Sequence, residues 1–351
     1  MVLINIKTKI SKHRRYYNNF KINLCLYGFV NIFLKKGLKM ELKDIVKYAM
    51  KALSYTNTKI NVTKNYELER KVINAMHYHY RAPFYETWDH NIRNNDHNVP
   101  VRIFTPKKED LKQDSKIIVF FHGGGWVTGN IDSYTKCCND MSKYLGHIIA
   151  SVDYRLAPEY PFPEGLMDCY QVAKTIILNS SILNTSPENI ILMGDSAGGN
   201  LAAAVSMMAR DTNEFKVSSQ ILLYPSTYND HSDNSPFPSI RENGKDFILT
   251  AAKICDYMDL YVKNKEDFQS PYLAPLLAKN FNNLPNTLII TAQYDPLRDE
   301  GEAFGEKLLQ AGNFTEIHRI NDAIHGFFTM PAKFSKVQAC YKIINDFLEK
   351  V

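Results

Sequence analysis

The chain has 351 residues, of which 45% are hydrophobic and 23% are charged. This balance is typical of a globular protein and excludes a disordered or fibrous one. The formal net charge of +5 comes from residues 1–40, which hold seven Lys, two Arg and no acidic residue, whereas the rest carries 33 basic against 37 acidic residues. A mildly acidic body lacks the positive surface that a phosphate backbone requires, so we expect no nucleic-acid partner.

Residues 1–40 form an atypical basic and apolar extension. The apolar stretch 22–34 is too short for a stable membrane span, which needs about 20 apolar residues. No small-residue cleavage site follows it, as a secretory signal would require. A weak membrane anchor and an export signal stay open, but we favour a segment absent from the native protein, with translation starting at Met40. The six scattered cysteines indicate reduced thiols and a cytoplasmic protein.

We expect residues 41–98 to form N-terminal cap helices and a lead-in, and residues 99–351 to form an α/β catalytic domain. Short apolar runs alternate there with helical patterns, which is typical of βαβ units in a mainly parallel sheet with helices on both faces. The predicted strands are residues 116–121, 147–152, 190–193, 219–223, 287–291 and 315–319. The predicted helices are residues 165–178, 247–263, 299–311 and 332–349.

The segment of about 227–283 interrupts this alternation. We expect it to form a cap insertion that, together with the N-terminal helices, covers the carboxyl ends of the strands. Ligands bind at those ends in open α/β sheets, so the cap would lie over the site.

The sequence HGGGW (residues 122–126) directly follows a predicted strand. Consecutive glycines leave backbone N–H groups free to point into a cavity, where they can stabilise the negative charge that develops during acyl transfer. A flexible turn stays open as an interpretation. A nucleotide-binding loop is not indicated, because no Gly-Lys-Ser/Thr follows.

The sequence GDSAG (residues 194–198) lies between a predicted buried strand and a stretch of small, helix-forming residues. Gly-x-Ser-x-Gly in this context is typical of a nucleophile elbow, a tight and strained turn that projects a serine at a helix N-terminus. Ser196 is therefore the candidate nucleophile, and the N–H of Ala197 is a candidate oxyanion donor.

A serine hydroxyl needs a base to take its proton and an acid to orient that base. With a nucleophile elbow, the chain order is Ser, then Asp or Glu, then His. Asp295 follows the next-to-last predicted strand and His325 follows the last, so both fall at the same sheet edge as the serine. Asp299 and Asp322 stay open as alternative acids, although a helix-capping role explains Asp299 better.

Six motifs along the chain resemble the hormone-sensitive-lipase-like branch of the α/β hydrolases over roughly residues 41–351. They are HGGGW (122–126), YRLAPE (154–159), GDSAGG (194–199), SPYLAPLLA (270–278), YDPLRDEG (294–301) and HGF (325–327). The resemblance implies the α/β-hydrolase fold with a helical cap and a triad of Ser196, Asp295 and His325. It also implies an oxyanion hole built from the N–H groups of Gly123, Gly124 and Ala197. Residues 1–40 have no counterpart in the family pattern.

We expect a serine carboxylesterase that hydrolyses small, short- to medium-chain esters through an acyl-enzyme on Ser196, with no metal or organic cofactor. A deacetylase or amidase acting on a sugar or secondary metabolite with the same triad is the alternative. A non-catalytic ligand-binding receptor is disfavoured because all three triad residues are present. Trp126 is a candidate substrate-binding residue that could also serve only in packing. A homodimer stays open.

Overall fold

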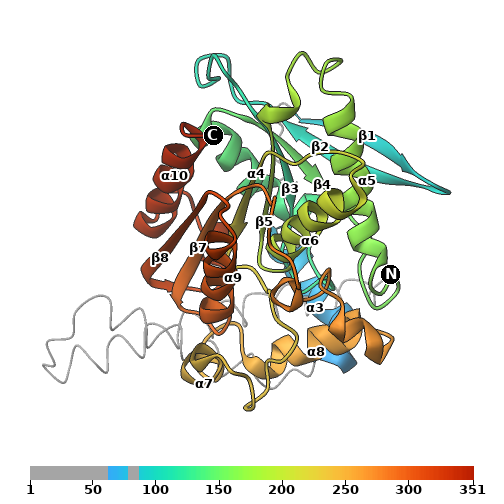
Figure 1. Cartoon of the computed structure of the whole chain (residues 1–351), viewed down its shortest axis with the longest axis vertical. Helices are drawn as coiled ribbons and strands as arrows, with labels where there is room; N and C mark the ends of the chain where they lie inside the picture. Colours follow the sequence, from blue (N-terminus) through green and yellow to red (C-terminus); the bar gives the residue numbers. More distant parts are fainter. Residues whose placement is uncertain (1–61, 78–86) are drawn as a thin grey trace, which may run out of the picture. The chain divides into compact units, whose positions relative to one another are not determined.

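The computed structural model describes residues 62–77 and 87–351, all within one compact unit spanning Ile60–Val351 (Figure 1). The predicted extension 1–40, its apolar stretch 22–34, the proposed start at Met40 and the cap helices expected before residue 62 lie outside the described residues. Within the described ranges, no helix has the length and apolar character needed to cross a membrane.

The described residues form an eight-stranded sheet in the order β1-β2-β4-β3-β5-β6-β7-β8. β1 and β2 pair antiparallel at one edge, β2 pairs antiparallel with β4, and all other pairs are parallel. The prediction of a mainly parallel sheet is therefore confirmed. The strands are β1 (Thr87–Asn94), β2 (His97–Phe104), β3 (Ile117–Phe121), β4 (Ile148–Val152), β5 (Ile190–Asp195), β6 (Ser219–Leu223), β7 (Asn286–Tyr294) and β8 (Thr315–Ile324).

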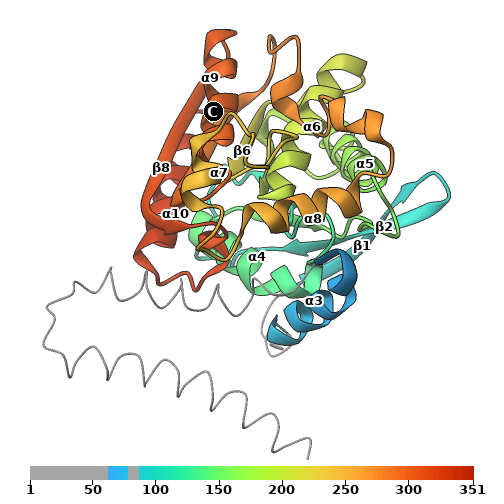
Figure 2. The ribbon, with the colours of Figure 1, turned by 90° about the horizontal axis from the view of Figure 1, so that it is seen from below.

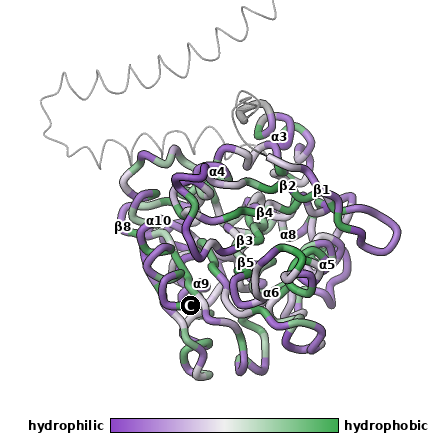
Figure 3. The backbone as a smooth tube through the Cα atoms, turned by 90° about the horizontal axis from the view of Figure 1, so that it is seen from above, coloured by the Kyte–Doolittle hydropathy of each residue, from purple (hydrophilic) through white to green (hydrophobic). Residues whose placement is uncertain are grey.

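Helices cover both faces of the sheet. One face packs against α4 (Ile131–Leu145) and α10 (Ser335–Leu348), and the other against α5 (Glu164–Leu178), α6 (Ala197–Thr212) and α9 (Arg298–Gln310). Because successive strand side chains point to opposite faces, β3 needs apolar residues at every position, and all five are buried. Figure 3 shows hydrophobic residues along the central strands β3 and β4, whereas hydrophobic and hydrophilic residues alternate along the helices.

Two described elements, β1 and α4, lack the clear hydrophobic sequence pattern from which a strand or a helix is predicted. Residues 87–94, assigned from the sequence to the lead-in, form the sheet edge β1. Its side chains are mostly exposed, so its sequence shows no apolar alternation. The helix α4 was not predicted because its buried stripe depends on Cys138 and Met141, and because its capping box pairs Asn130 with Ser133 instead of Glu or Gln.

The carboxyl edge of the sheet is covered by α3 (Val62–His77), α7 (Pro238–Asn243) and α8 (Ala251–Tyr261) (Figure 2). Helix α3 packs on α8, where the Val62 N–H donates to Asp256 at 3.0 Å. The segment 227–283 is anchored near the elbow by Asn200, whose amide donates to the carbonyls of Ser226 at 2.8 Å and Leu273 at 2.7 Å. Four short 3₁₀ helices complete the described elements: η2 (Pro187–Asn189), η3 (Lys265–Gln269), η4 (Pro275–Leu277) and η5 (Phe327–Thr329).

Candidate active site

Ser196 occupies the turn between β5 and α6. Its backbone has φ 56° and ψ −118°, a left-handed conformation that is strained for a residue with a side chain. Close approach explains the glycines beside it. A Cβ on Gly194 would lie 2.2 Å from the Gly198 carbonyl oxygen, and one on Gly198 would lie 1.9 Å from the Phe121 carbonyl oxygen. The Ser196 N–H donates to the Leu223 carbonyl at 2.8 Å, so β3 and β6 together fix the turn.

His325 follows directly on the end of β8. That strand runs to Ile324, five residues beyond its predicted end, because it pairs with β7 again after an irregularity in the register. The His325 Nε2 lies 2.8 Å from the Ser196 Oγ. The ring of Tyr224 packs edge-on against the imidazole, with ring centroids 4.9 Å apart. The imidazole is thus held on one side while it faces the serine.

Asp295 lies in the loop between β7 and α9, and its side chain is fully buried. One carboxylate oxygen lies 2.7 Å from the His325 Nδ1, and the other accepts the Leu297 N–H at 2.8 Å. The amide of Asn243 on α7 donates to the Asp295 backbone carbonyl at 3.2 Å. A hydrogen-bonded chain therefore runs from Asp295 through His325 to Ser196, as the strand order predicted.

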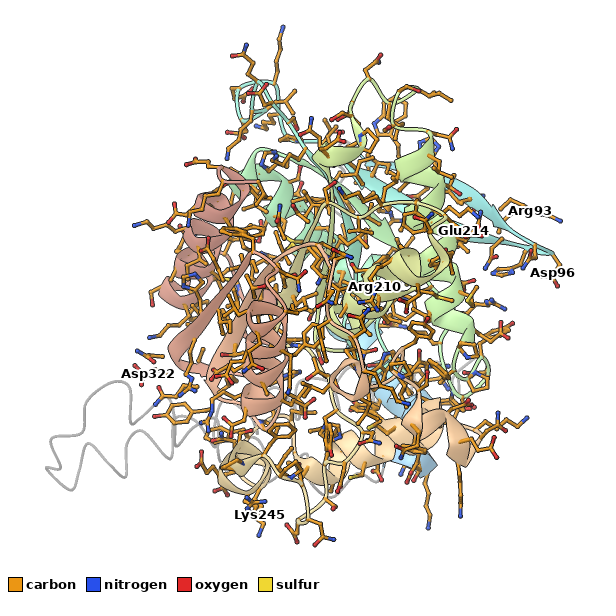
Figure 4. All side chains as sticks on the ribbon, viewed as in Figure 1. Arg93, Asp96, Arg210, Glu214, Lys245 and Asp322 are labelled. Atoms are coloured by element: carbon orange, nitrogen blue, oxygen red, sulfur yellow. The ribbon has the colours of Figure 1, made fainter. Side chains whose placement is uncertain are left out.

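The two alternative acids lie elsewhere. Asp299 accepts the Ser239 N–H at 2.7 Å and pairs with Arg298, so it caps the start of α7 and not its own helix α9. Asp322 is exposed, and its side chain projects outward from the end of β8 beside Lys336 (Figure 4). Neither carboxylate contacts the imidazole.

The residues 122–128, here termed the glycine loop, lie beside the elbow and correct one prediction. The Gly123 N–H is not free: it donates to the Asp195 carboxylate at 2.7 Å and to the Tyr134 hydroxyl oxygen at 3.1 Å. Gly123 is therefore wrong as an oxyanion donor. The sequence alone does not indicate this, because the carboxylate that accepts the Gly123 N–H lies 72 residues further along the chain.

Three other N–H groups in the glycine loop and the elbow have no acceptor within residues 62–77 and 87–351. They belong to Gly124, Gly125 and Ala197. Gly124 has φ 120° and Gly125 has φ 61°, values that favour glycine. The turn is closed by the Gly124 carbonyl, which accepts the N–H groups of Val127 at 3.1 Å and Thr128 at 2.9 Å. Of the three glycines, Gly124 and Gly125 thus keep an N–H group without an acceptor among the described residues.

Asp195 joins the elbow to the glycine loop. Burial raises the pKa of this carboxyl to about 6, although the hydrogen bonds from Gly123 and Tyr134 oppose the rise. At neutral pH the group is mainly ionised and holds both donors. The GDSAG motif by itself does not indicate this link, because Gly123 is distant from Asp195 in sequence.

His122 begins the glycine loop as a buried, neutral imidazole. Burial lowers its pKa to about 4. Its ring stacks on Tyr154 with centroids 4.4 Å apart, and the Tyr154 hydroxyl donates to the His122 carbonyl at 2.7 Å. The first residue of the loop is therefore fixed to the segment that follows β4.

Trp126, predicted to bind substrate, is only 3% exposed. Its indole stacks on Tyr261 of α8, with centroids 4.7 Å apart and planes 3° apart. The contacts observed for Trp126 are thus packing contacts between the glycine loop and α8, and its role in substrate binding stays a prediction.

Residues 118–329 match the family described as alpha/beta hydrolase fold. Over 303 residues the chain is also 33% identical to an arylesterase of Saccharolobus solfataricus, covering 86% of this chain and 92% of that relative. The chain belongs to the α/β-hydrolase family.

Further similarities lie in the esterase branch of that family. The carboxylesterase NlhH of Mycobacterium tuberculosis is 34% identical over 233 residues, or 66% of this chain and 71% of the relative. A hyperthermophilic esterase from Pyrobaculum calidifontis superposes with a TM-score of 0.75 at 31% identity, covering 89% of this chain and 99% of that structure. The branch predicted from the six sequence motifs is confirmed.

Proposed function

We propose that this α/β hydrolase is a serine carboxylesterase that works through an acyl-enzyme on Ser196. The observation that carries the proposal is the hydrogen-bonded chain from the buried Asp295 through His325 to the Ser196 hydroxyl, with distances of 2.7 and 2.8 Å. Such a chain activates a serine that is otherwise a weak nucleophile. The similarity to named esterases points to the same chemistry.

In the first half of the reaction, the His325 Nε2 takes the proton from Ser196 and the serine oxygen attacks the ester carbonyl carbon. The negative charge passes to the carbonyl oxygen, where the N–H groups of Gly124, Gly125 and Ala197 donate to it. Each such donor typically contributes about 3 kcal/mol to the stability of the transition state. His325 then protonates the departing alkoxide, which leaves the acyl group on the serine.

In the second half, water attacks the acyl-enzyme with His325 again as the base, and the acid product leaves. Asp295 keeps its charge throughout: it holds the Nδ1–H of the imidazole and stabilises the imidazolium that forms twice per cycle. The Leu297 N–H bonds to the other carboxylate oxygen and fixes that orientation.

We infer that the substrates are esters with short to medium acyl chains. Aromatic side chains crowd the site: the Tyr257 ring packs directly on Gly125, and Tyr224 packs against His325. Bulky rings at these positions leave less room for a long acyl chain than small side chains would.

A panel of p-nitrophenyl esters from two to sixteen carbons tests both parts of the proposal, with a p-nitroanilide and an acetylated sugar as competing substrates. We expect turnover that is greatest at the short end and absent in Ser196→Ala. A preference for long chains contradicts the substrate range. Preferred cleavage of the anilide or the sugar ester indicates an amidase or deacetylase with the same triad. Undiminished turnover by Ser196→Ala contradicts the proposed nucleophile.

A further inference from the structure

We propose that Arg70 of α3 is a positioning residue for the oxyanion hole, because its guanidinium fixes the backbone of the glycine loop that carries the Gly124 and Gly125 donors. The inference rests on the proposed function and adds to it a residue that touches neither substrate nor the triad. Helix α3 thus contributes to catalysis and does not only cover the site.

The Arg70 guanidinium makes four hydrogen bonds to the loops beside the elbow. Its Nε donates to the Val127 carbonyl at 2.6 Å, and one Nη donates to the Ala157 carbonyl at 2.5 Å. The two Nη atoms also bind the two carboxylate oxygens of Glu159, each at 2.8 Å. A planar guanidinium has several donors in a fixed geometry, so it can bond two carbonyls and a carboxylate at the same time. A lysine ammonium cannot reproduce this set of hydrogen bonds.

Both carbonyls lead directly to the proposed donors. Val127, held through its carbonyl, donates its own N–H to the Gly124 carbonyl at 3.1 Å. Ala157, held in the same way, donates its N–H to the Trp126 carbonyl at 2.9 Å. Arg70 therefore closes a ring of hydrogen bonds around the turn whose peptide groups supply the Gly124 and Gly125 N–H donors.

A second contact from α3 acts on the same turn. The Tyr257 ring of α8 lies against Gly125 so closely that a Cβ there would come within 2.4 Å of it. The Tyr257 hydroxyl donates at 3.0 Å to Glu69, the neighbour of Arg70 in the chain. Helix α3 thus contacts the turn directly through the Arg70 guanidinium, and indirectly through Glu69, which holds the Tyr257 ring against Gly125.

The ion pair alone does not account for this arrangement. Glu159 is 45% exposed, and a pair at that exposure contributes little to stability. The buried carbonyls of Val127 and Ala157 matter more than the ion pair. A buried acceptor that loses its donor has no water to replace it, so the conformation in which it is buried becomes less stable. We therefore expect the loss of Arg70 to distort the backbone of the turn that carries Gly124 and Gly125.

Arg210 provides a matched control for the variant Arg70→Ala. Its guanidinium also bonds two loop carbonyls, those of Asn280 at 2.9 Å and Asn282 at 3.1 Å, and it pairs with Asp211. Its side chain is similarly buried, at 15% exposure against 21% for Arg70. It lies at the opposite end of α6 from Ser196, about 20 Å away along the helix axis.

The experiment compares the full-length wild type with Arg70→Ala, Arg70→Lys and Arg210→Ala on p-nitrophenyl acetate, with melting temperatures recorded for each. Active sites are counted by complete labelling with a fluorophosphonate, so that kcat is expressed per competent site and misfolded protein is excluded. We expect Arg70→Ala to lose about 10- to 100-fold in kcat per site with KM nearly unchanged, as for a misplacement of transition-state donors. Arg210→Ala stays within about twofold of wild type.

Two further readouts separate positioning from general stability. Arg70→Lys keeps the charge but can make only some of the hydrogen bonds, so its kcat falls between those of wild type and Arg70→Ala. The acidic limb of the pH–rate profile stays where it is in wild type, because the base is unaffected. A kcat per site for Arg70→Ala within about twofold of wild type, or a defect confined to KM, overturns the inference. Failure of the proposed function looks different: the wild type itself would show neither turnover nor labelling at Ser196.

Discussion

The substitution Gly198→Ala probes how closely the elbow must approach the strand that leads into the glycine loop. A Cβ at residue 198 would lie 1.9 Å from the Phe121 carbonyl oxygen, 2.6 Å from its carbonyl carbon and 2.7 Å from the His122 carbonyl oxygen. All three contacts are to backbone atoms, so no side-chain rotation relieves them. The elbow and the end of β3 must move apart by about 1 Å, a displacement of the size that typically costs about 100-fold in rate.

This displacement separates the two halves of the proposed catalytic site. Ser196 and Ala197 move with the elbow, while Gly124 and Gly125 move with the end of β3. We expect kcat to fall about 10²- to 10³-fold, comparable to the loss of one oxyanion donor. Overpacking of this kind also costs about 1–3 kcal/mol of stability, which lowers the melting temperature.

Gly301→Ala makes the same chemical change at a position with room for it. Residue 301 lies in α9, where a Cβ would meet its nearest neighbours at 3.4 Å, an ordinary contact. Alanine also favours the helical conformation over glycine by up to about 1 kcal/mol. Steady-state kinetics per fluorophosphonate-reactive site, with thermal unfolding, compares the two variants. Near-wild-type kcat in Gly198→Ala, or an equal loss in both variants, refutes the argument from close approach.

Three further substitutions test the acid of the triad and the pH dependence of stability. Asp295→Asn should lower kcat by about 10⁴-fold, because the amide cannot hold the His325 imidazole in the required tautomer. Asp322→Asn should keep kcat within about twofold of wild type. The reverse ranking in steady-state assays would assign the acid to residue 322. Burial lowers the pKa of His147 to about 4, and its Nδ1 must stay unprotonated to accept the Lys116 N–H at 3.1 Å. Between pH 6.5 and pH 4 this imidazole is protonated in the unfolded state but not in the folded state. The free energy of unfolding therefore decreases as the pH falls through that window, by at most about 3 kcal/mol. His147→Asn keeps an acceptor without the titration, so urea unfolding across that range should show a shallower fall; an unchanged slope would contradict this cause.

Much of the fold could be predicted because its information is local. The strands beneath the site are buried on both faces, so each reads as an unbroken apolar run, and each functional loop follows directly from such a run. Ser196, Asp295 and His325 could be proposed together for this reason: the carboxyl ends of parallel strands meet at one edge, and the structure brings the three side chains into contact there.

The parts that could not be predicted depend on contacts between distant segments. The choice between Gly123 and Gly125 as a donor is decided by the Asp195 carboxylate, 72 residues away from Gly123 in sequence. Arg70 is one charge among many on a polar helix until the fold brings it to Val127. The exposed edge strand β1 carries no apolar pattern from which to recognise it.

The most direct measurement of the central claim is the covalent state of the Ser196 peptide during turnover. The wild type is mixed with p-nitrophenyl acetate, quenched in acid within milliseconds, digested and weighed by mass spectrometry. We expect an acetyl group on Ser196 that forms together with a burst of p-nitrophenol and disappears as the substrate is used up. Steady turnover with that serine never acylated would contradict it.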